Sequence, residues 1–132
     1  MTGPALVLII EDNERNLKLA RDILNHAGYE TLEAENAEDG LELARARHPG
    51  LVLMDVQLPG MDGVQALVRL RADPATADIP VIALTANALP RDRAQAMADG
   101  FFDYLTKPID VGRLLQAIDS ALSSGHGAAP PR

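Results

Sequence analysis

The sequence predicts a single α/β domain with a doubly wound parallel sheet, that is, a sheet covered by helices on both faces. Three short apolar runs, at residues 5–10, 51–54 and 81–84, have the length of strands and show no alternation of polar and apolar residues. Such continuous runs are typical of parallel strands that are buried on both faces. Apolar residues at helical spacing lie between these runs, so strands and helices alternate along the chain.

The remaining elements follow from the same periodicities. Weaker strand candidates lie at residues 29–34 and 102–105, and together with the three apolar runs they give a strand followed by a helix, repeated five times. Gly28, Gly50 and Gly100 lie just past a helix or in the loop before a strand, where a positive φ is often required. Helices are expected over five segments: 17–27, 37–44, 64–68, 90–98 and 111–122.

Composition and charge exclude several classes of protein. The chain of 132 residues has room for one domain, expected over residues 1–122, and a tail at 123–132 that is rich in Gly, Pro and Ser and predicted to be disordered. The absence of cysteine excludes disulfide scaffolds and zinc-thiolate sites. A net charge of -7 opposes contact with nucleic acid or with anionic membranes. There is neither a long apolar run nor a secretion signal, so we expect a cytoplasmic location.

Polar side chains follow four of the predicted strands. In chain order they are Glu11 and Asp12, Asp55, Thr85, and Lys107. Open parallel sheets bind ligands outside the carboxyl ends of their strands, so these side chains are expected at one rim of the sheet. Two like charges about 4 Å apart repel by about 4 kcal/mol at an effective dielectric of about 20, and a single lysine cannot balance three carboxylates. An all-oxygen cluster of this kind favours Mg²⁺, which completes its shell with water and phosphate oxygen.

Each of these residues also has a purely structural explanation. Asp12 or Asn13 could cap the following helix, because both residue types are preferred there. Asp55 and Thr85 could be ordinary loop residues, and Lys107 could be a solvated surface lysine. Their joint appearance at the ends of four strands favours a functional site instead.

The order of motifs narrows the chemistry further. P-loop nucleotidases need GxxxxGK[ST] and dinucleotide-binding domains need GxGxxG, whereas the first strand here runs into EDNERN. A haloacid-dehalogenase-type phosphatase needs a second aspartate two residues after the first, where this chain has Gln57, so rapid hydrolysis is not expected. The remaining interpretation is an aspartate, Asp55, that attacks phosphorus with assistance from a metal ion and retains the phosphoryl group for some time.

On these motifs the sequence resembles the receiver domains of two-component response regulators over residues 5–122. The segments that match are IIEDN, LMDVQLPGMDG, ALTANA and YLTKPID. The chain is similar to single-domain regulators of the DivK type and to the receiver modules of hybrid histidine kinases. The resemblance implies a flavodoxin-like (βα)5 fold in three layers, with a five-stranded parallel sheet in the order 2-1-3-4-5.

The resemblance also implies a phosphorylation site that depends on Mg²⁺. Asp55 would receive the phosphoryl group from a phospho-histidine of a sensor histidine kinase or a histidine phosphotransfer protein. Asp12, Asp55 and the backbone carbonyl of Gln57 would hold the metal ion, and Glu11 would act through water. The Lys107 ammonium would bind the oxygens of the phosphoryl group.

The resemblance also implies a conformational switch and residues that control the lifetime of the phosphoryl group. The Thr85 hydroxyl would bind a phosphoryl oxygen and move inward, and Tyr104 would rotate toward the vacated space, unless this tyrosine only fills the core. The surface of the fourth helix, fifth strand and fifth helix would then change shape. Gln57 and Asn87 flank the line of attack of hydrolytic water in this family and would set the phosphoryl lifetime, unless they are only solvated loop residues. The Lys107-Pro108 peptide bond is expected to be cis.

These expectations describe a signalling protein rather than an enzyme, although one that assists its own phosphorylation and dephosphorylation. We expect a single-domain response regulator that signals to an effector protein through protein contacts. The alternative is a phosphorelay intermediate, or the isolated receiver of a hybrid histidine kinase, in which Asp55 mainly passes the phosphoryl group onward. Neither reading involves nucleic acid or a membrane.

Overall fold

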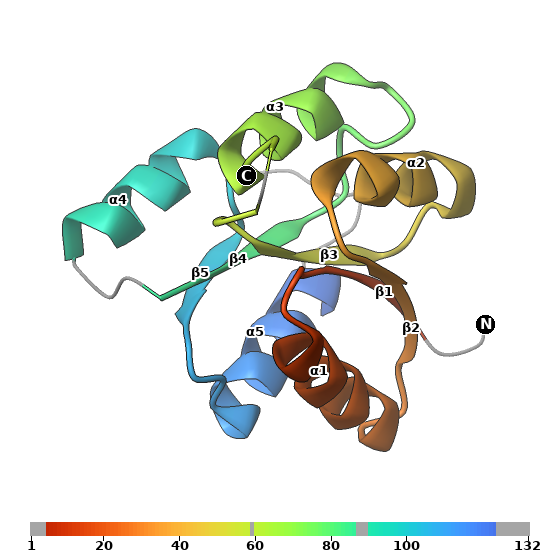
Figure 1. The fold of residues 1–132 in the computed structure, drawn as a ribbon, viewed down its shortest axis with the longest axis vertical. Coiled ribbons are helices and arrows are strands. Elements are labelled where there is room, and N and C mark those ends of the chain that lie inside the picture. The colour runs from red at the N-terminus through yellow and green to blue at the C-terminus, as the bar shows by residue number, and fades with distance from the viewer. Residues whose placement is uncertain (1–4, 59, 87–89, 124–132) are drawn as a thin grey trace.

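The computed structural model describes residues 5–58, 60–86 and 90–123, and for residues 90–92 the backbone alone. Within these ranges strands and helices alternate strictly (Figure 1). The strands are β1 (Leu6–Ile10), β2 (Glu30–Ala34), β3 (Leu51–Asp55), β4 (Val81–Thr85) and β5 (Asp103–Thr106). The helices are α1 (Glu14–His26), α2 (Ala37–Arg47), α3 (Gly63–Ala72), α4 (Pro90–Asp99) and α5 (Val111–Ser123).

All four strand pairs are parallel, and the sheet has the order β2-β1-β3-β4-β5. Figure 1 shows this sheet between two helical layers, with α1 and α5 on one face and α2, α3 and α4 on the other. The predicted doubly wound, three-layer fold and its strand order are therefore confirmed. Because the chain order reverses between β1 and β3, the crevice for a ligand lies at the carboxyl ends of these two strands.

Two apolar clusters, one on each face of the sheet, explain the continuous apolar runs. In β3, Leu51 and Leu53 pack against α1 and α5, whereas Val52 and Met54 pack against the helices of the other face. All four side chains are fully buried. Since successive residues of a strand point to opposite faces, a strand covered on both sides must be apolar at every position.

Side-chain caps fix the starts of α1, α2 and α3. Asn13 Oδ1 accepts a hydrogen bond from the Asn16 N–H at 3.0 Å, so the cap of α1 is Asn13 and not Asp12. Asp62 and Gln65 form a reciprocal capping box at the start of α3. The Asp12 side chain is therefore not used to begin a helix.

Two of the three glycines expected to need a positive φ do adopt one, but the third does not. Gly28 has φ +99° and Gly100 has φ +112°. The expectation for Gly50 is wrong, because the left-handed residue at that turn is His48, with φ 48°, which caps the end of α2. Gly50 serves close packing instead, since a Cβ on it would lie 3.2 Å from Cδ2 of Leu122.

Some apolar residues that fit the helical spacing are exposed rather than buried. In α3 the buried stripe runs through Ala66, Leu67 and Leu70, while Val64 and Val68 are exposed. Within the described part of the chain, the helices lack the combination of length and apolarity that crossing a bilayer requires. Ser123, which the sequence placed in the tail, is the last residue of α5, and residues 124–132 lie outside the described ranges.

Candidate functional site

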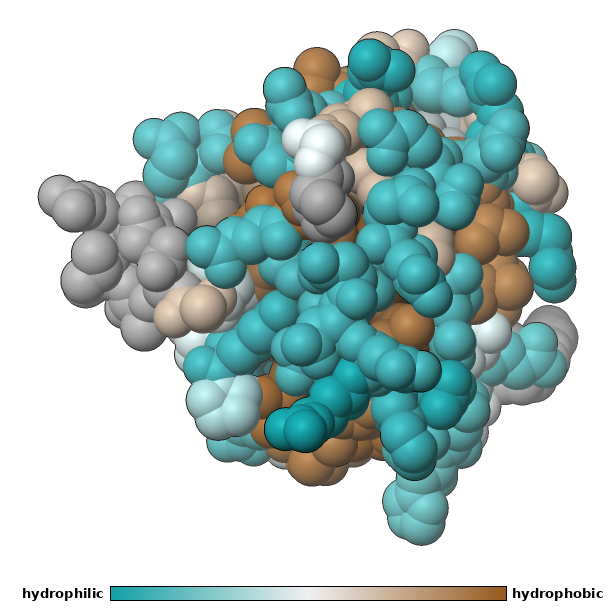
Figure 2. Space-filling view, in the orientation of Figure 1, coloured by the Kyte–Doolittle hydropathy of each residue, from teal (hydrophilic) through white to brown (hydrophobic). Residues whose placement is uncertain are grey.

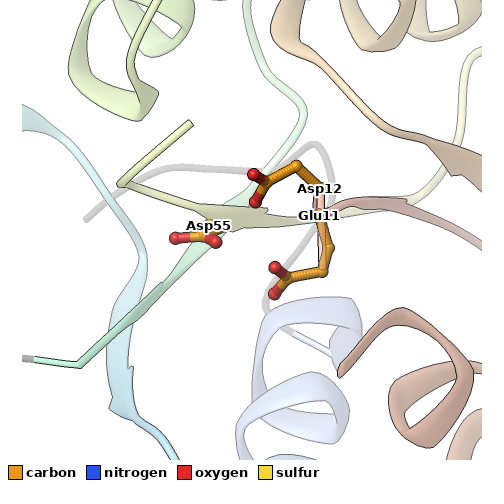
Figure 3. A group of neighbouring side chains, drawn as sticks. All are labelled: Glu11, Asp12 and Asp55. Atoms are coloured by element: carbon orange, nitrogen blue, oxygen red, sulfur yellow. The ribbon is translucent and has the colours of Figure 1, made fainter. Parts of the chain in front are cut away.

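The strand ends bring the predicted residues together at one rim of the sheet. Glu11 and Asp12 directly follow β1, while Asp55 and Thr85 are the last residues of β3 and β4. Figure 3 shows Glu11 and Asp12 leaving the end of β1 on opposite sides and turning toward Asp55. One oxygen atom from each of the three carboxylates lies within 4.8 Å of the other two.

Lys107 lies between two of the carboxylates. Its Nζ donates a hydrogen bond to Asp55 Oδ2 at 2.9 Å and lies 3.0 Å from Glu11 Oε1. Burial disfavours the ammonium, but the contacts with Asp55 and Glu11 outweigh this and raise the pKa of Lys107 above its ordinary value. The lysine therefore stays charged at the rim.

The backbone holds Lys107 in this place. Its N–H donates to the carbonyl of Thr85 at 2.8 Å, which continues the pairing of β4 with β5 beyond the last residue pair of the two strands. The Lys107-Pro108 peptide bond is cis in the structure. The hydrogen bond to Thr85 thus fixes the backbone of Lys107 at the end of the sheet, and the contacts with Asp55 and Glu11 hold its ammonium.

Glu11 is a buried acid with one unsatisfied oxygen. It is 1% exposed, and its Oε2 accepts a hydrogen bond from the Asn13 N–H at 3.1 Å. Its Oε1 faces Lys107 without hydrogen-bond geometry, and is the buried side-chain atom of the described residues that has no hydrogen-bond partner. Burial raises the pKa of Glu11 to about 6, with Asp55 adding to the rise and Lys107 and the Asn13 N–H opposing it.

Asp55 is oriented by the loop that follows it. The Gln57 N–H donates to Asp55 Oδ1 at 2.9 Å, so each oxygen of this carboxylate has one donor. The start of α3 lies close behind this loop, because a Cβ on Gly63 would meet Cα of Val56 at 2.6 Å and the carbonyl oxygen of Asp55 at 3.1 Å. Only glycine permits this approach, a role that the sequence analysis missed although the glycine stands in the quoted motif.

The donor set suits a hard divalent cation. The cluster holds three carboxylates and one ammonium, which contacts two of them. All the candidate ligand atoms are oxygen, and Asp12 is exposed so that an ion can reach it. The buried Glu11 Oε1 lies 3.0 Å from the Lys107 ammonium without a well-formed hydrogen bond, so it can accept a further contact. Mg²⁺ prefers oxygen ligands and binds through one or two carboxylates while retaining water, so the residues present fit this ion.

The remaining candidate residues are divided between the rim, the core and the undescribed part of the chain. The side chain of Thr85 is buried at the rim, and Tyr104 is buried within the cluster under α2, α3 and α4. The Gln57 side chain is exposed beside Asp55. Asn87 lies outside the described residues.

A second ionic cluster, missed from the sequence, connects the elements around Tyr104. Arg113 of α5 donates two hydrogen bonds to the Asp103 carboxylate at 3.0 and 3.1 Å. Arg93 of α4 donates to the same carboxylate at 3.3 Å and to the carbonyl of Tyr104 at 3.2 Å. Burial raises the pKa of Asp103, but the hydrogen bonds from Arg113 and the Tyr104 N–H outweigh it and leave the pKa below its ordinary value. Asp103 thus ties α4, β5 and α5 together.

Comparison with known proteins points to one family. Residues 7–119 match the model of the response regulator receiver domain. The chain is 43% identical over 119 residues to the polar-differentiation response regulator DivK of Brucella anthropi, which covers 90% of this chain and 97% of the relative. It is also 43% identical over 116 residues to DivK of Brucella ovis, which covers 88% of this chain and 94% of the relative.

Solved structures of similar fold point the same way. The receiver domain of the sensor histidine kinase PA1611 from Pseudomonas aeruginosa, with a magnesium ion coordinated in its active site cleft, superposes with a TM-score of 0.85 at 31% identity, over 92% of this chain and 100% of that one. The receiver domain of a signal transduction histidine kinase from Syntrophus aciditrophicus gives a TM-score of 0.83 at 29% identity, over 97% of both chains.

The raised pKa of Glu11 predicts that, in metal-free buffer, the contribution of this residue to the free energy of unfolding depends on pH. The folded protein binds this proton more tightly than the unfolded chain, with a pKa of about 6 against 4.5. The contribution of Glu11 to the free energy of unfolding is therefore present at low pH and falls as the pH rises through 6, by on the order of 2 kcal/mol. Glu11→Gln should remove this fall. Urea unfolding with chelator, from about pH 4.5 to 7.5, should show the variant gaining stability relative to wild type as the pH rises; a constant difference would contradict the assignment.

Proposed function

The chain belongs to the response regulator receiver domain family, and we propose that it is a single-domain response regulator whose Asp55 accepts a phosphoryl group from a phospho-histidine. The observation that supports this most is the setting of Asp55. Its carboxylate ends a fully buried strand, is oriented by the Gln57 N–H, and has the Lys107 ammonium 2.9 Å away. A carboxylate placed in this way is a nucleophile with a cation ready for the oxygens of its reaction partner.

The proposed transfer exchanges one bond to phosphorus for another. An Asp55 oxygen forms a bond to the phosphorus atom while the P–N bond to the donor histidine breaks, and the electron pair of that bond returns to the imidazole nitrogen. Lys107 shifts its hydrogen bonds from the Asp55 carboxylate to the oxygens of the arriving group. The Thr85 hydroxyl, at the neighbouring strand end, binds another of these oxygens.

The proposal includes Mg²⁺ as the cofactor. Asp12, Asp55 and the backbone carbonyl of Gln57 would hold the ion, with Glu11 acting through water. When bound, Mg²⁺ supplies positive charge that stabilises the oxygens of the transferred group. Lys107 alone cannot supply this charge, because it already faces two carboxylates.

We propose Thr85 and Tyr104 as the switch. The phosphoryl group brings roughly -1.5 to -2 charges to the rim and draws the Thr85 hydroxyl toward it. Tyr104 is buried, and its backbone carbonyl accepts a hydrogen bond from Arg93. A change at Tyr104 would therefore reach α4 directly, and α5 through Asp103. The proposed output is a changed α4-β5-α5 surface for an effector protein.

The partners in this proposal are proteins, and the chain itself remains a signalling protein rather than a turnover enzyme. The phosphoryl donor is a sensor histidine kinase or a histidine phosphotransfer protein. Self-catalysed dephosphorylation, rather than a separate hydrolase activity, returns the chain to its resting state. The expected cytoplasmic location forms part of the same proposal.

A second candidate function is supported by the structural relatives. Two of them are receiver domains of histidine kinases, a setting in which the group on Asp55 would mainly be relayed onward. The DivK relatives favour the stand-alone regulator, because the alignment covers 97% of the Brucella anthropi protein. Incubating the phosphorylated chain with a histidine phosphotransfer protein separates the two: rapid back-transfer of the phosphoryl group favours the relay.

The acceptor role predicts a mass change that depends on one residue and on Mg²⁺. After treatment with a small phosphodonor, wild type with Mg²⁺ should gain one phosphoryl mass, because Asp55 is the nucleophile. Asp55→Ala should gain none, and neither should wild type with chelator. The control is Asp78→Ala, which removes an exposed carboxylate outside the cluster of Glu11, Asp12 and Asp55 and should gain the phosphoryl mass as wild type does. Intact-protein mass spectrometry checks this, and uptake by Asp55→Ala equal to that of wild type would disprove the role of Asp55.

The switch role of Thr85 predicts that phosphate uptake by Asp55 can be separated from the coupling of Asp55 to α5. Thr85→Ala should still accept phosphate, yet lose most of the coupling between Asp55 and α5, which typically corresponds to about 5- to 150-fold in partner affinity. Amide NMR shifts on phosphorylation should spread to β5 and α5 in wild type and stay near the rim in Thr85→Ala. Thr106→Ala, which changes the residue paired with Thr85 in β5, is the matched control. Wild-type shifts in Thr85→Ala would refute the switch.

We also propose that Gln57 and Asn87 set the lifetime of the phosphoryl group. Gln57 is exposed directly beside Asp55, where its amide can order or exclude an attacking water. Substituting either residue by alanine should change the rate of phosphate loss severalfold while uptake still occurs. Rates that stay the same in both variants would show that these side chains have no part in the timing.

A further inference from the structure

A groove of about 800 Å³ lies at the β2 edge of the sheet. Because β1 lies between β2 and β3, this groove is separated from Asp55 by one strand. Its walls come from α1, β2 and α2, and none of these elements includes Thr85 or Tyr104. The groove therefore belongs neither to the acceptor site nor to the proposed switch.

The floor of the groove is apolar. Leu17 of α1 and Ala34 of β2 are buried beneath it, and Leu43 and Ala46 of α2 form one side. At the right-hand edge of Figure 2, where Figure 1 places α2, apolar surface is visible between hydrophilic residues. An apolar side chain inserted here would remove the accessible apolar surface of Leu43 and Ala46 from water.

The rim of the groove is acidic and largely unbalanced. Glu33, Glu35, Asp39 and Glu42 line it, whereas none of its lining residues is a lysine or arginine. Glu33 forms an ion pair with Arg21 at 3.0 Å. The other three carboxylates form no ion pair with any described residue.

We propose that this groove docks a segment of a partner protein that presents an apolar side chain flanked by arginine or lysine. The apolar side chain would cover the floor, and the basic residues would meet the carboxylates of Glu35, Asp39 and Glu42, none of which forms an ion pair with a described residue. The Asp39 carboxylate also accepts a hydrogen bond from the side chain of Asn36 at 3.2 Å. Nucleic acid and anionic membranes would be repelled by the same carboxylates. A second copy of this chain, with a net charge of -7, would bring further negative charge to the rim.

Docking at this groove is independent of phosphorylation. The groove is formed by α1, β2 and α2, whereas the proposed signal passes through β4, β5 and α5. A partner held here would stay close to the rim, because the Glu11 N–H donates to the carbonyl of Ala34 at 3.0 Å, where the groove and the acceptor site meet. The groove thus provides a contact that does not change with phosphorylation, in addition to the proposed α4-β5-α5 contact that does.

The test uses two synthetic helical peptides of equal length, each with leucine on one face and with either arginine or glutamate on the other. Each is titrated into the full chain, and amide NMR shifts report the position and affinity of binding. The arginine peptide should shift the amides of Leu43 and Ala46, while the glutamate peptide should not bind. The double variant E35Q/E42Q should weaken binding at least about threefold, since each exposed ion pair contributes modestly.

The matched control is E14Q/E30Q, which makes the same change in net charge at exposed carboxylates outside the groove. It should bind the arginine peptide within about twofold of wild type, because only long-range attraction changes. Asp55→Ala should also bind the arginine peptide as wild type does. Loss of phosphoryl uptake and loss of peptide binding are therefore separate results, and each tests a different proposal. Equal weakening in both double variants, shifts away from the groove, or no binding of the arginine peptide would each overturn the proposal.

Discussion

The excess of negative charge at the carboxyl ends of the strands is the constraint on which the site depends. Asp55, Glu11 and Asp12 place three carboxylates within reach of one another, and Lys107 contacts two of them. One ammonium cannot neutralise three anions, so the folded chain retains an unfavourable charge cluster until a cation or a proton relieves it. Burial, and after it the neighbouring Asp55, raises the pKa of Glu11 to about 6, so protonation of Glu11 is one way to reduce the negative charge. Mg²⁺, in the function proposed above, is the other.

The parallel sheet makes this cluster possible. Packing on both faces fixes β1 and β3 firmly, so that residues at their ends cannot move apart to reduce repulsion. The backbone then orients each acid: Asn13 donates to Glu11, and Gln57 donates to Asp55. Gly63 lets α3 begin directly behind the Asp55 loop. The hydrophobic core thus provides the rigidity that an otherwise repulsive arrangement needs.

Periodicity was sufficient to predict a doubly wound α/β domain, and the strand ends were sufficient to predict the rim, whereas the strand order came from the resemblance to receiver domains. Continuous apolar runs such as Leu51–Met54 are typical of strands covered on both faces, which made β3 and the position of Asp55 predictable. What the sequence could not show depends on distances between elements. The near-complete burial of Glu11, the sharing of Asp103 by Arg93 and Arg113, and the exposure of Val68 in α3 follow from tertiary packing. The choice of His48 rather than Gly50 for the left-handed turn also depends on where α2 ends.

The most direct test of the charge constraint is the change in thermal unfolding temperature on adding MgCl2, with NaCl of equal ionic strength as the reference. Asp12→Asn is the informative variant, because Asp12 is exposed and does not contact Lys107, so its charge can be removed without leaving the lysine unpaired. We predict that Mg²⁺ raises the unfolding temperature of wild type through binding to the folded state, and that Asp12→Asn loses most of this rise. No rise in wild type, or an equal rise in both proteins, would contradict a metal-binding rim built on these three carboxylates.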